Sequence, residues 1–262
     1  MGDSFATTVL GRTGLTVGRL GMSASFGMPA AALERAFEEG MNYLYWGSMR
    51  KRAFADGIRN LSRYRERMVL VVQSYAPFGG FVRRSLETAL RKLGFDYADV
   101  LLLGMWNRPV TPGVLDAVRD LKQRGLVRFL AVSTHNRPLV ARLAENPDYD
   151  IFHVRYNAVH PGAEQDVFPH LPAENPPGIV AFTATSWRQL LKHRRIPNHE
   201  RVPTAGDCYR FVLSNPAVNI CMTGAAKLEH TEHALEAFRR GPLSPDEMQW
   251  IRRVGSAIYG RK

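Results

Sequence analysis

Short apolar segments alternate with helical patterns along most of this chain. The apolar segments are mostly continuous in hydrophobicity, which is typical of parallel strands covered on both faces. We expect eight such strands, at residues 19–22, 43–46, 68–73, 99–103, 127–132, 151–154, 179–182 and 218–222. Helical patterns occur at residues 30–39, 80–93, 114–124, 137–145, 207–213, 229–238 and 244–259. This alternation predicts an α/β fold with a parallel sheet.

The number of strands and the chain length together indicate a barrel. Eight strand–helix units in 262 residues match the usual size of a (β/α)₈ barrel. A doubly wound sheet is the alternative, but no glycine-rich dinucleotide fingerprint follows an early strand. Residues 8–17 are expected to form a hairpin with Gly14 at its turn, closing the bottom of the barrel. We therefore predict one TIM-barrel domain over residues 1–262, with an N-terminal β-hairpin and an extra C-terminal helix after Ser244.

The charge of the chain bears on its partners. The formal net charge is +11, which favours anions such as nucleotide phosphates or acidic metabolites. No basic cluster is interleaved with aromatic residues, and no helix-turn-helix or zinc-finger signature occurs. We therefore expect solvated basic helix faces and no nucleic-acid partner. The basic, irregular stretch between Phe182 and Pro203 is expected to form a loop over the barrel mouth.

Several classes of protein are excluded by what the sequence lacks. No apolar run approaches the roughly 18 residues of a membrane span, and the N-terminus does not have the pattern of a signal peptide. The two cysteines, Cys208 and Cys221, form no metal-binding pattern, and no His/Cys cluster has zinc spacing. Cys221 is expected to be a buried thiol. We expect a cytoplasmic protein without a metal.

Five motifs follow one another in the order of a known family. They are LGRTGLTV at 10–17, GMNY at 40–43, SLETALRKLGFDYADV at 85–100, GLVRFLAVS at 125–133 and RYN at 155–157. Together they resemble the aldo-keto reductase family, from about Val9 to Phe238. The resemblance implies a barrel that binds NADP(H) without a Rossmann domain and reduces carbonyl compounds.

The family's catalytic side chains are not retained. Its members protonate the carbonyl oxygen with a Tyr, whose pKa is lowered by a Lys that is paired with an Asp, and a His orients the carbonyl. Aligned through the Gly-Met-Asn motif, Tyr45 takes the place of the Asp and Arg50 that of the Tyr. Gln73 or Ser74 replaces the Lys, and Gly104 replaces the His. The family's proton-donor mechanism is therefore not expected; a Tyr45 donor assisted by the permanent charge of Arg50 is a hypothesis.

The cofactor positions are retained in part. The resemblance implies that Ser133, Thr134 and His153 meet the nicotinamide amide and that Phe182 stacks on its ring. It also implies that the 2′-phosphate end meets the start of a helix, whose dipole favours anions. The residues expected there are Gly224, Lys227 and His230. The family's Glu-Asn pair for adenine is replaced by His233 and Ala234.

Several polar residues should meet at the C-terminal mouth of the barrel, where such folds build their sites. The catalytic candidates are Tyr45, Arg50, Trp106 and His135, with Arg155, Asn157 and His160 nearby. Ordinary structural roles remain open for them as well: Tyr45 and Trp106 as core, Arg50 as an exposed helix residue, His135 as a helix cap and His153 as a satisfied interior histidine.

Three functions are consistent with the sequence. The first is an NADP(H)-binding oxidoreductase with a non-standard active site for a small-molecule substrate. The second is a pseudoenzyme that binds a nucleotide or anionic metabolite, and the third is a non-redox enzyme in the same barrel. The sequence identifies neither the substrate nor the oligomeric state.

Overall fold

The computed structural model describes residues 5–47 and 52–260. Within them, parallel strands close into a barrel in the order β10-β3-β4-β5-β6-β7-β8-β9. The strands are β3 (Leu20–Ser23), β4 (Tyr43–Trp46), β5 (Val69–Ser74), β6 (Ala98–Leu103), β7 (Val127–Thr134), β8 (Ile151–Arg155), β9 (Gly178–Phe182) and β10 (Ile220–Thr223). All eight bounds lie within two residues of the predicted ones. The predicted (β/α)₈ barrel is confirmed.

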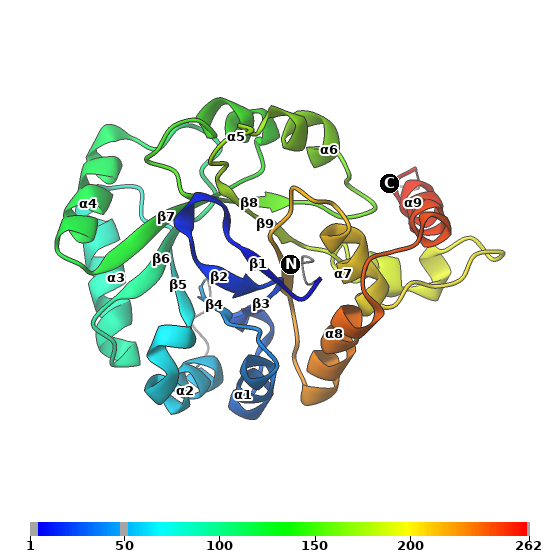
Figure 1. Cartoon of the computed structure of the whole chain (residues 1–262), viewed down its shortest axis with the longest axis horizontal. Helices are drawn as coiled ribbons and strands as arrows, with labels where there is room; N and C mark the ends of the chain where they lie inside the picture. The colour runs from blue at the N-terminus through cyan, green and yellow to red at the C-terminus, as the bar shows by residue number, and fades with distance from the viewer. Residues whose placement is uncertain (1–4, 48–51, 261–262) are drawn as a thin grey trace.

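Helices surround the barrel, as Figure 1 shows. They are α1 (Ala30–Glu38), α2 (Arg52–Asn60), α3 (Gly79–Leu93), α4 (Pro112–Gln123), α5 (Arg137–Leu143), α6 (Ala163–Asp166), α7 (Ala205–Leu213), α8 (Leu228–Arg240) and α9 (Pro245–Tyr259). Their apolar faces pack on the outer face of the strands and form the larger core. A second core fills the inside of the barrel, so the barrel is packed and not a pore.

The N-terminal hairpin closes one end of the barrel, as predicted. Its strands are β1 (Thr7–Val9) and β2 (Thr16–Gly18), and Gly14 has the left-handed backbone (φ 69°) that the turn requires. Leu10 is fully buried in the interior core. The side-chain nitrogen of Asn219, just before β10, donates to the backbone oxygen of Val9 over 3.0 Å. The opposite end, where the parallel strands finish, is therefore left for a site.

The irregular stretch between β9 and α7 differs in part from its prediction. It consists of short turns, but its later part lies against α9 instead of over the mouth. The Trp250 indole nitrogen of α9 donates to the Arg201 backbone oxygen (3.2 Å), and Arg253 pairs with Glu200 (2.8 Å). Only the beginning of the stretch, residues 183–188, follows β9 at the mouth. The extra helix α9 therefore holds this long connection to the side of the barrel.

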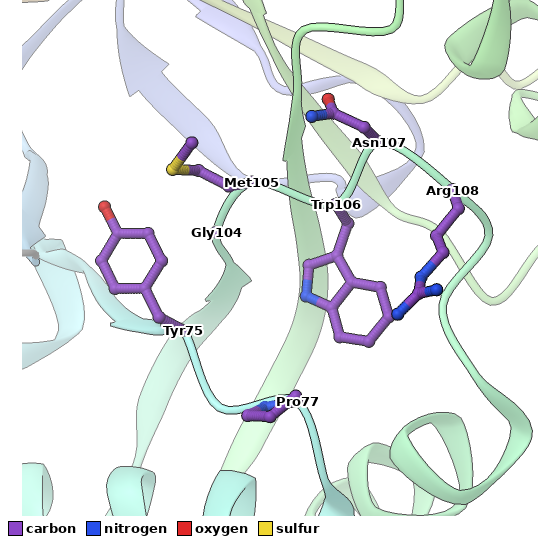
Figure 2. A pocket seen from close by; sticks show the side chains of 7 residues that line it. All are labelled: Tyr75, Pro77, Gly104, Met105, Trp106, Asn107 and Arg108. Atoms are coloured by element: carbon purple, nitrogen blue, oxygen red, sulfur yellow. The ribbon is translucent and has the colours of Figure 1, made fainter.

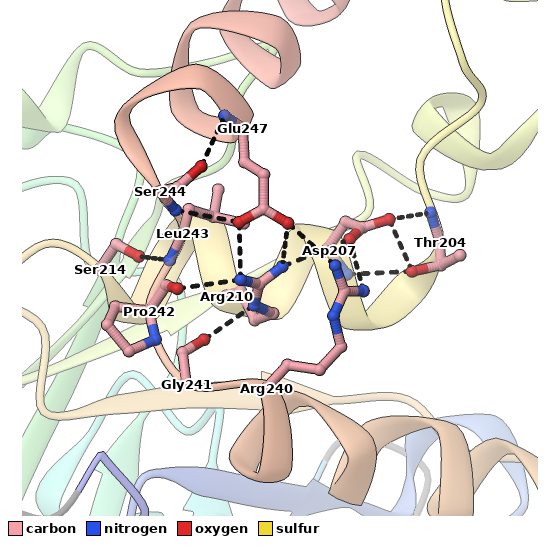
Figure 3. A network of polar contacts seen from close by, with 10 residues as sticks. All are labelled: Thr204, Asp207, Arg210, Ser214, Arg240, Gly241, Pro242, Leu243, Ser244 and Glu247. Atoms are coloured by element: carbon pink, nitrogen blue, oxygen red, sulfur yellow. Dashed lines mark hydrogen bonds and ion pairs between the residues drawn. The ribbon is translucent and has the colours of Figure 1, made fainter.

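A network of ion pairs joins the last three helices (Figure 3). Arg210 of α7 is buried and makes two hydrogen bonds to Glu247 of α9, at 2.8 and 2.7 Å. Arg240 of α8 bridges Asp207 and Glu247, each at 2.9 Å. Ser244 and Glu247 also form the capping box of α9 that the sequence predicts in part. The network therefore ties the C-terminal end of α8 to α7 and to the first turn of α9.

Candidate functional site

Alternate residues of each strand face the inside of the barrel, and this alternation decides which side chains reach the mouth. Tyr43, Val71 and Ile151 belong to the interior core. Continuing their rows toward the strand ends brings Tyr45 on β4 and Gln73 on β5 to the C-terminal mouth. On β8 the same row holds His153 and then Arg155. The sequence predicts all four residues at the mouth; the register agrees for Tyr45, Gln73 and Arg155, whereas His153 lies deeper in the barrel.

Tyr45 and Gln73 are the residues that the sequence resemblance aligns with the family's Asp and Lys. The Tyr45 hydroxyl donates to the Gln73 side-chain oxygen. Ser74, the other residue considered for the Lys position, faces outward, and its hydroxyl accepts from the Ala76 N–H over 3.2 Å. The ambiguity between Gln73 and Ser74 is thereby resolved in favour of Gln73. Arg50, which falls in the position of the family's Tyr, lies outside the described residues.

Gly104 is the residue that the sequence resemblance aligns with the family's His, and its neighbours fill the space beside it. A Cβ atom at position 104 would lie 2.5 Å from the Gln73 amide nitrogen and 2.5 Å from the Tyr75 ring. Real Cβ atoms do not approach other heavy atoms so closely. An imidazole therefore cannot stand at this position unless Tyr75 or Gln73 moves. Tyr75 was not among the predicted site residues, because one sequence does not reveal which ring occupies the space beside a glycine.

His153 lies deeper in the barrel than the sequence suggested. Its Nε2 atom is 2.8 Å from the Tyr43 hydroxyl, and the residue is 4% exposed. Burial lowers the pKa of His153 to about 3, so the ring is neutral at physiological pH. Burial likewise raises the pKa of Tyr43. His153 would have to give up its partner to meet a nicotinamide amide, and its cofactor role remains a prediction.

Ser133 and Thr134 end β7 and hold the neighbouring loop. The Ser133 hydroxyl accepts from the Met105 N–H over 3.0 Å. The Thr134 hydroxyl donates to the Asn107 side chain (3.1 Å) and accepts from the Asn136 N–H (2.9 Å). The Thr134 hydroxyl thus acts both as a donor and as an acceptor. The Ser133 hydroxyl acts as an acceptor within the described residues, so its hydrogen can be donated to a ligand.

A hollow of about 410 Å³ lies beside the mouth, between the loops that follow β5 and β6. Figure 2 shows Tyr75 and Pro77 on one loop and Met105, Trp106 and Arg108 on the other. The catalytic candidate Trp106 is largely buried and forms part of the wall. Met105 has a left-handed backbone (φ 59°), which is rare for a residue with a side chain and is more frequent at functional loops.

His135 and Phe182 lie together across β7 and β9. Their rings meet edge to face with centroids 5.7 Å apart. The pKa of His135 is lowered, first by burial and then by the positive charge of Arg155. Asn157 and His160 shape the adjoining loop: the Asn157 amide donates to the Thr183 oxygen (2.9 Å), and its oxygen accepts from the His160 N–H (2.9 Å). These two residues have structural partners, whereas the ring edges of His135 and Phe182 border the mouth.

The start of α8 carries the residues expected at the 2′-phosphate. Lys227 is the N-cap, its side chain is exposed, and it makes no ion pair with any described carboxylate. His230 accepts from the Ala226 N–H over 3.2 Å. A Cβ on Gly224 would lie 2.6 Å from the ring of Phe26, which is 60% exposed. Phe26, missed in the sequence analysis, follows β3 and covers this glycine.

No group of three or more His, Cys, Asp or Glu side chains among the described residues could hold a metal ion. No helix in that part of the chain is long and apolar enough to cross a membrane. Cys208 and Cys221 are both buried and free, as expected for Cys221.

Comparisons with known proteins bear on the family and the fold of this chain. A model of the aldo/keto reductase family matches residues 79–193. L-Galactose dehydrogenase of Arabidopsis thaliana is 28% identical over 150 residues, which is 47% of this chain and 47% of that protein. The aligned region therefore spans about half the length of this curated relative.

Solved structures match over nearly the whole chain. An aldo-keto reductase of Bacillus halodurans in its holo form superposes with a TM-score of 0.79 and 19% identity, covering 96% of both chains. An aldo/keto reductase of Klebsiella pneumoniae in complex with NADP and acetate has a TM-score of 0.75 and 21% identity, covering 95% of both. Residues 79–193 thus carry the sequence signature of the aldo/keto reductase family, and the chain as a whole has the barrel fold of that family's solved members.

Proposed function

We propose that this chain binds NADP(H) and acts as an oxidoreductase of the aldo-keto reductase type, with an active site that lacks the family's proton-donor set. The observation that carries the proposal is Lys227, an exposed cation at the start of α8 with no carboxylate partner among the described residues. A helix N-terminus together with a free ammonium group favours a phosphate. The NADP complex of the Klebsiella pneumoniae relative supports the choice of nucleotide.

The residues present fit the nucleotide at three places. Lys227 and the first turn of α8 would hold the 2′-phosphate. The Ser133 hydroxyl, with its hydrogen free to donate, would meet the carboxamide, and the Phe182 ring would lie against the nicotinamide. Phe26 is exposed and therefore able to give way at Gly224. When bound, NADPH would supply a hydride to a carbonyl carbon.

Reduction of a carbonyl also needs a residue that donates a proton to the carbonyl oxygen. Gln73 cannot act as an acid, and Gly104 has no side chain. Tyr45 is the phenol at the mouth, and we propose it as the donor, through the hydroxyl that now donates to Gln73. A Tyr45→Phe variant should then bind NADPH unchanged and lose its turnover. Full turnover in that variant would remove Tyr45 as the donor.

Binding without reduction is the second candidate function. The filled space at Gly104 and the uncharged Gln73 favour it, because neither position supplies the polarising groups that the family uses. The two candidates share the nucleotide site and differ in the fate of the hydride. A chain that binds NADPH but oxidises none of it with a panel of aldehydes and ketones would belong to this second class.

The test is a fluorescence titration with NADPH and with NADH. We expect saturable binding of NADPH, and Lys227→Ala should weaken it about tenfold by removing a charged phosphate contact. The same substitution should change NADH affinity little. Lys192→Ala, which removes an equal charge from an exposed residue elsewhere, is the matched control. A folded chain that binds neither nucleotide would contradict the proposal.

A further inference from the structure

Arg155 is a charged side chain at the mouth that forms no ion pair within the part of the chain that the structure describes. It lies two residues after His153 on the same face of β8 and is half-buried at the end of that strand. Its Nε atom is buried without a hydrogen bond. The guanidinium makes no ion pair with any described carboxylate, although many arginines on the surface of this chain do. A guanidinium removed in part from water and left unpaired is a strong attractor for an anion.

An aromatic wall stands beside this charge. The Trp187 ring centroid lies 5.9 Å from the Arg155 Cζ atom, and Trp187 is 55% exposed. On the neighbouring strand, Phe182 is the direct register partner of Arg155. His135 completes the group through its edge contact with Phe182. The arrangement offers one cationic fork next to apolar ring faces.

The backbone that presents Trp187 is unusual. Ser186, Trp187 and Arg188 have φ values of 49°, 52° and 67°, three consecutive residues in the left-handed region. Each such residue costs free energy, and such conformations gather where a loop serves a ligand. The hydroxyl oxygen of Ser186 is also buried without a partner. The loop therefore adopts an unfavourable backbone conformation that places the exposed Trp187 beside Arg155.

We propose that Arg155 binds the carboxylate of a substrate whose neighbouring apolar or aromatic part packs on Trp187 and Phe182. Arg suits this role because its planar fork matches a carboxylate and makes two parallel hydrogen bonds. The nucleotide phosphates have their own site after β10, whereas Arg155 ends β8, with β9 between them. The inference names the substrate class of the proposed reductase: small carboxylates that also carry the carbonyl.

Fluorine NMR titration with 4-fluorobenzoate and its uncharged counterpart 4-fluorobenzamide tests this assignment without any nucleotide. The unmodified chain should bind the carboxylate at least about tenfold more tightly than the amide, the size expected of a charge-assisted pair. Arg155→Gln should remove that preference, and Arg155→Lys should retain part of it. Arg188→Gln, which removes an equal charge next to Trp187, should leave the preference unchanged.

Three results would overturn the inference. They are equal affinity for the two compounds in the unmodified chain, an undiminished preference in folded Arg155→Gln, and a preference lost equally in Arg188→Gln. The first comparison needs no variant, so it holds even if Arg155→Gln does not fold. In the second of these cases, a loss of NADPH affinity in Arg155→Gln would reassign the arginine to the nucleotide.

The outcome is separable from that of the proposed function. If the carboxylate binds through Arg155 while neither nucleotide binds, the inference stands as an anion site and the reductase proposal fails. If NADPH binds through Lys227 while the carboxylate preference is absent, the reductase proposal stands and the substrate class does not. The two titrations use different probes and different variants.

Discussion

The Tyr45 hydroxyl donates a hydrogen bond to the Gln73 side-chain oxygen, joining β4 to β5 inside the barrel mouth. In the family resemblance these positions belong to an Asp and a Lys. Where the resemblance implies an ion pair, this chain has a pair in which the amide can carry no charge. The half-buried guanidinium of Arg155 then faces a mouth without that carboxylate. This difference in charge links the uncharged Tyr45–Gln73 pair to the carboxylate preference proposed for Arg155.

The space at Gly104 gives a first prediction. Gly104→Ala should lower the free energy of unfolding by about 1 kcal/mol or more, because the new Cβ would overlap Gln73 and Tyr75. Urea denaturation measures the change. Gly113→Ala is the matched control: nothing lies within 4 Å of a Cβ there, and the residue is in α4, so the substitution should stabilise the chain by about 0.5–1 kcal/mol.

The same crowding predicts a coupling between positions 104 and 75. Tyr75 is half exposed, and truncating it in Tyr75→Ala frees the space beside Gly104. The double variant should therefore lose less stability than the two single variants added together. Strict additivity would mean that Tyr75 does not restrict position 104.

The buried His153 gives a prediction about acid stability. The native state keeps the ring neutral down to a pKa of about 3, whereas the unfolded chain takes up the proton near pH 6.5. The unfolded state therefore binds more protons between these values, and stability falls as the pH drops below about 6.5, by at most about 1.4 kcal/mol per pH unit. Between pH 7 and pH 5, His153 should account for a loss of up to about 2 kcal/mol.

The comparison that isolates this effect uses His153→Gln. Glutamine can still bond to the Tyr43 hydroxyl but takes up no proton. Its stability should fall less between pH 7 and pH 5 than that of the unmodified chain, measured by urea denaturation at both pH values. Substitution of the exposed His193 by Gln should leave the pH dependence as it is. If the free energy of unfolding of His153→Gln changed between pH 7 and pH 5 as much as that of the unmodified chain, the His153 ring would take up its proton in the native state as it does in the unfolded state.

The helix network gives a third prediction. The hydrogen bonds from Arg210 lower the pKa of Glu247 to about 2. Arg210→Met should reduce the free energy of unfolding by about 1.5–3 kcal/mol, since it removes the charged hydrogen bonds from Arg210 and leaves Asp207 and Glu247 with Arg240 alone. It should also raise the pKa of Glu247, which NMR titration of the carboxyl carbon measures. Arg59→Met, which breaks a pair with Asp56 in which both side chains are more than a third exposed, should cost less than about 1 kcal/mol.

The fold was predictable because barrel strands are covered on both faces and therefore leave continuous apolar segments. Two helices were missed for local reasons: α6 has four residues, and α2 carries its apolar residues within a highly charged stretch. The mouth was harder to predict. The register decides between Gln73 and Ser74, and the space around Gly104 and Gly224 depends on Tyr75 and Phe26, which come from other loops. The position of Trp187 depends on three consecutive residues with a left-handed backbone conformation. None of them is a glycine, so the sequence does not indicate that conformation.

Hydrogen–deuterium exchange with and without saturating NADPH tests the central claim most directly, because it locates the nucleotide on the barrel. The account predicts slower exchange in peptides covering residues 223–231 and 133–136, with no change in the hairpin at residues 7–18. Unaltered exchange throughout, or protection confined to the far end of the barrel, would contradict an NADP(H) site at the C-terminal mouth.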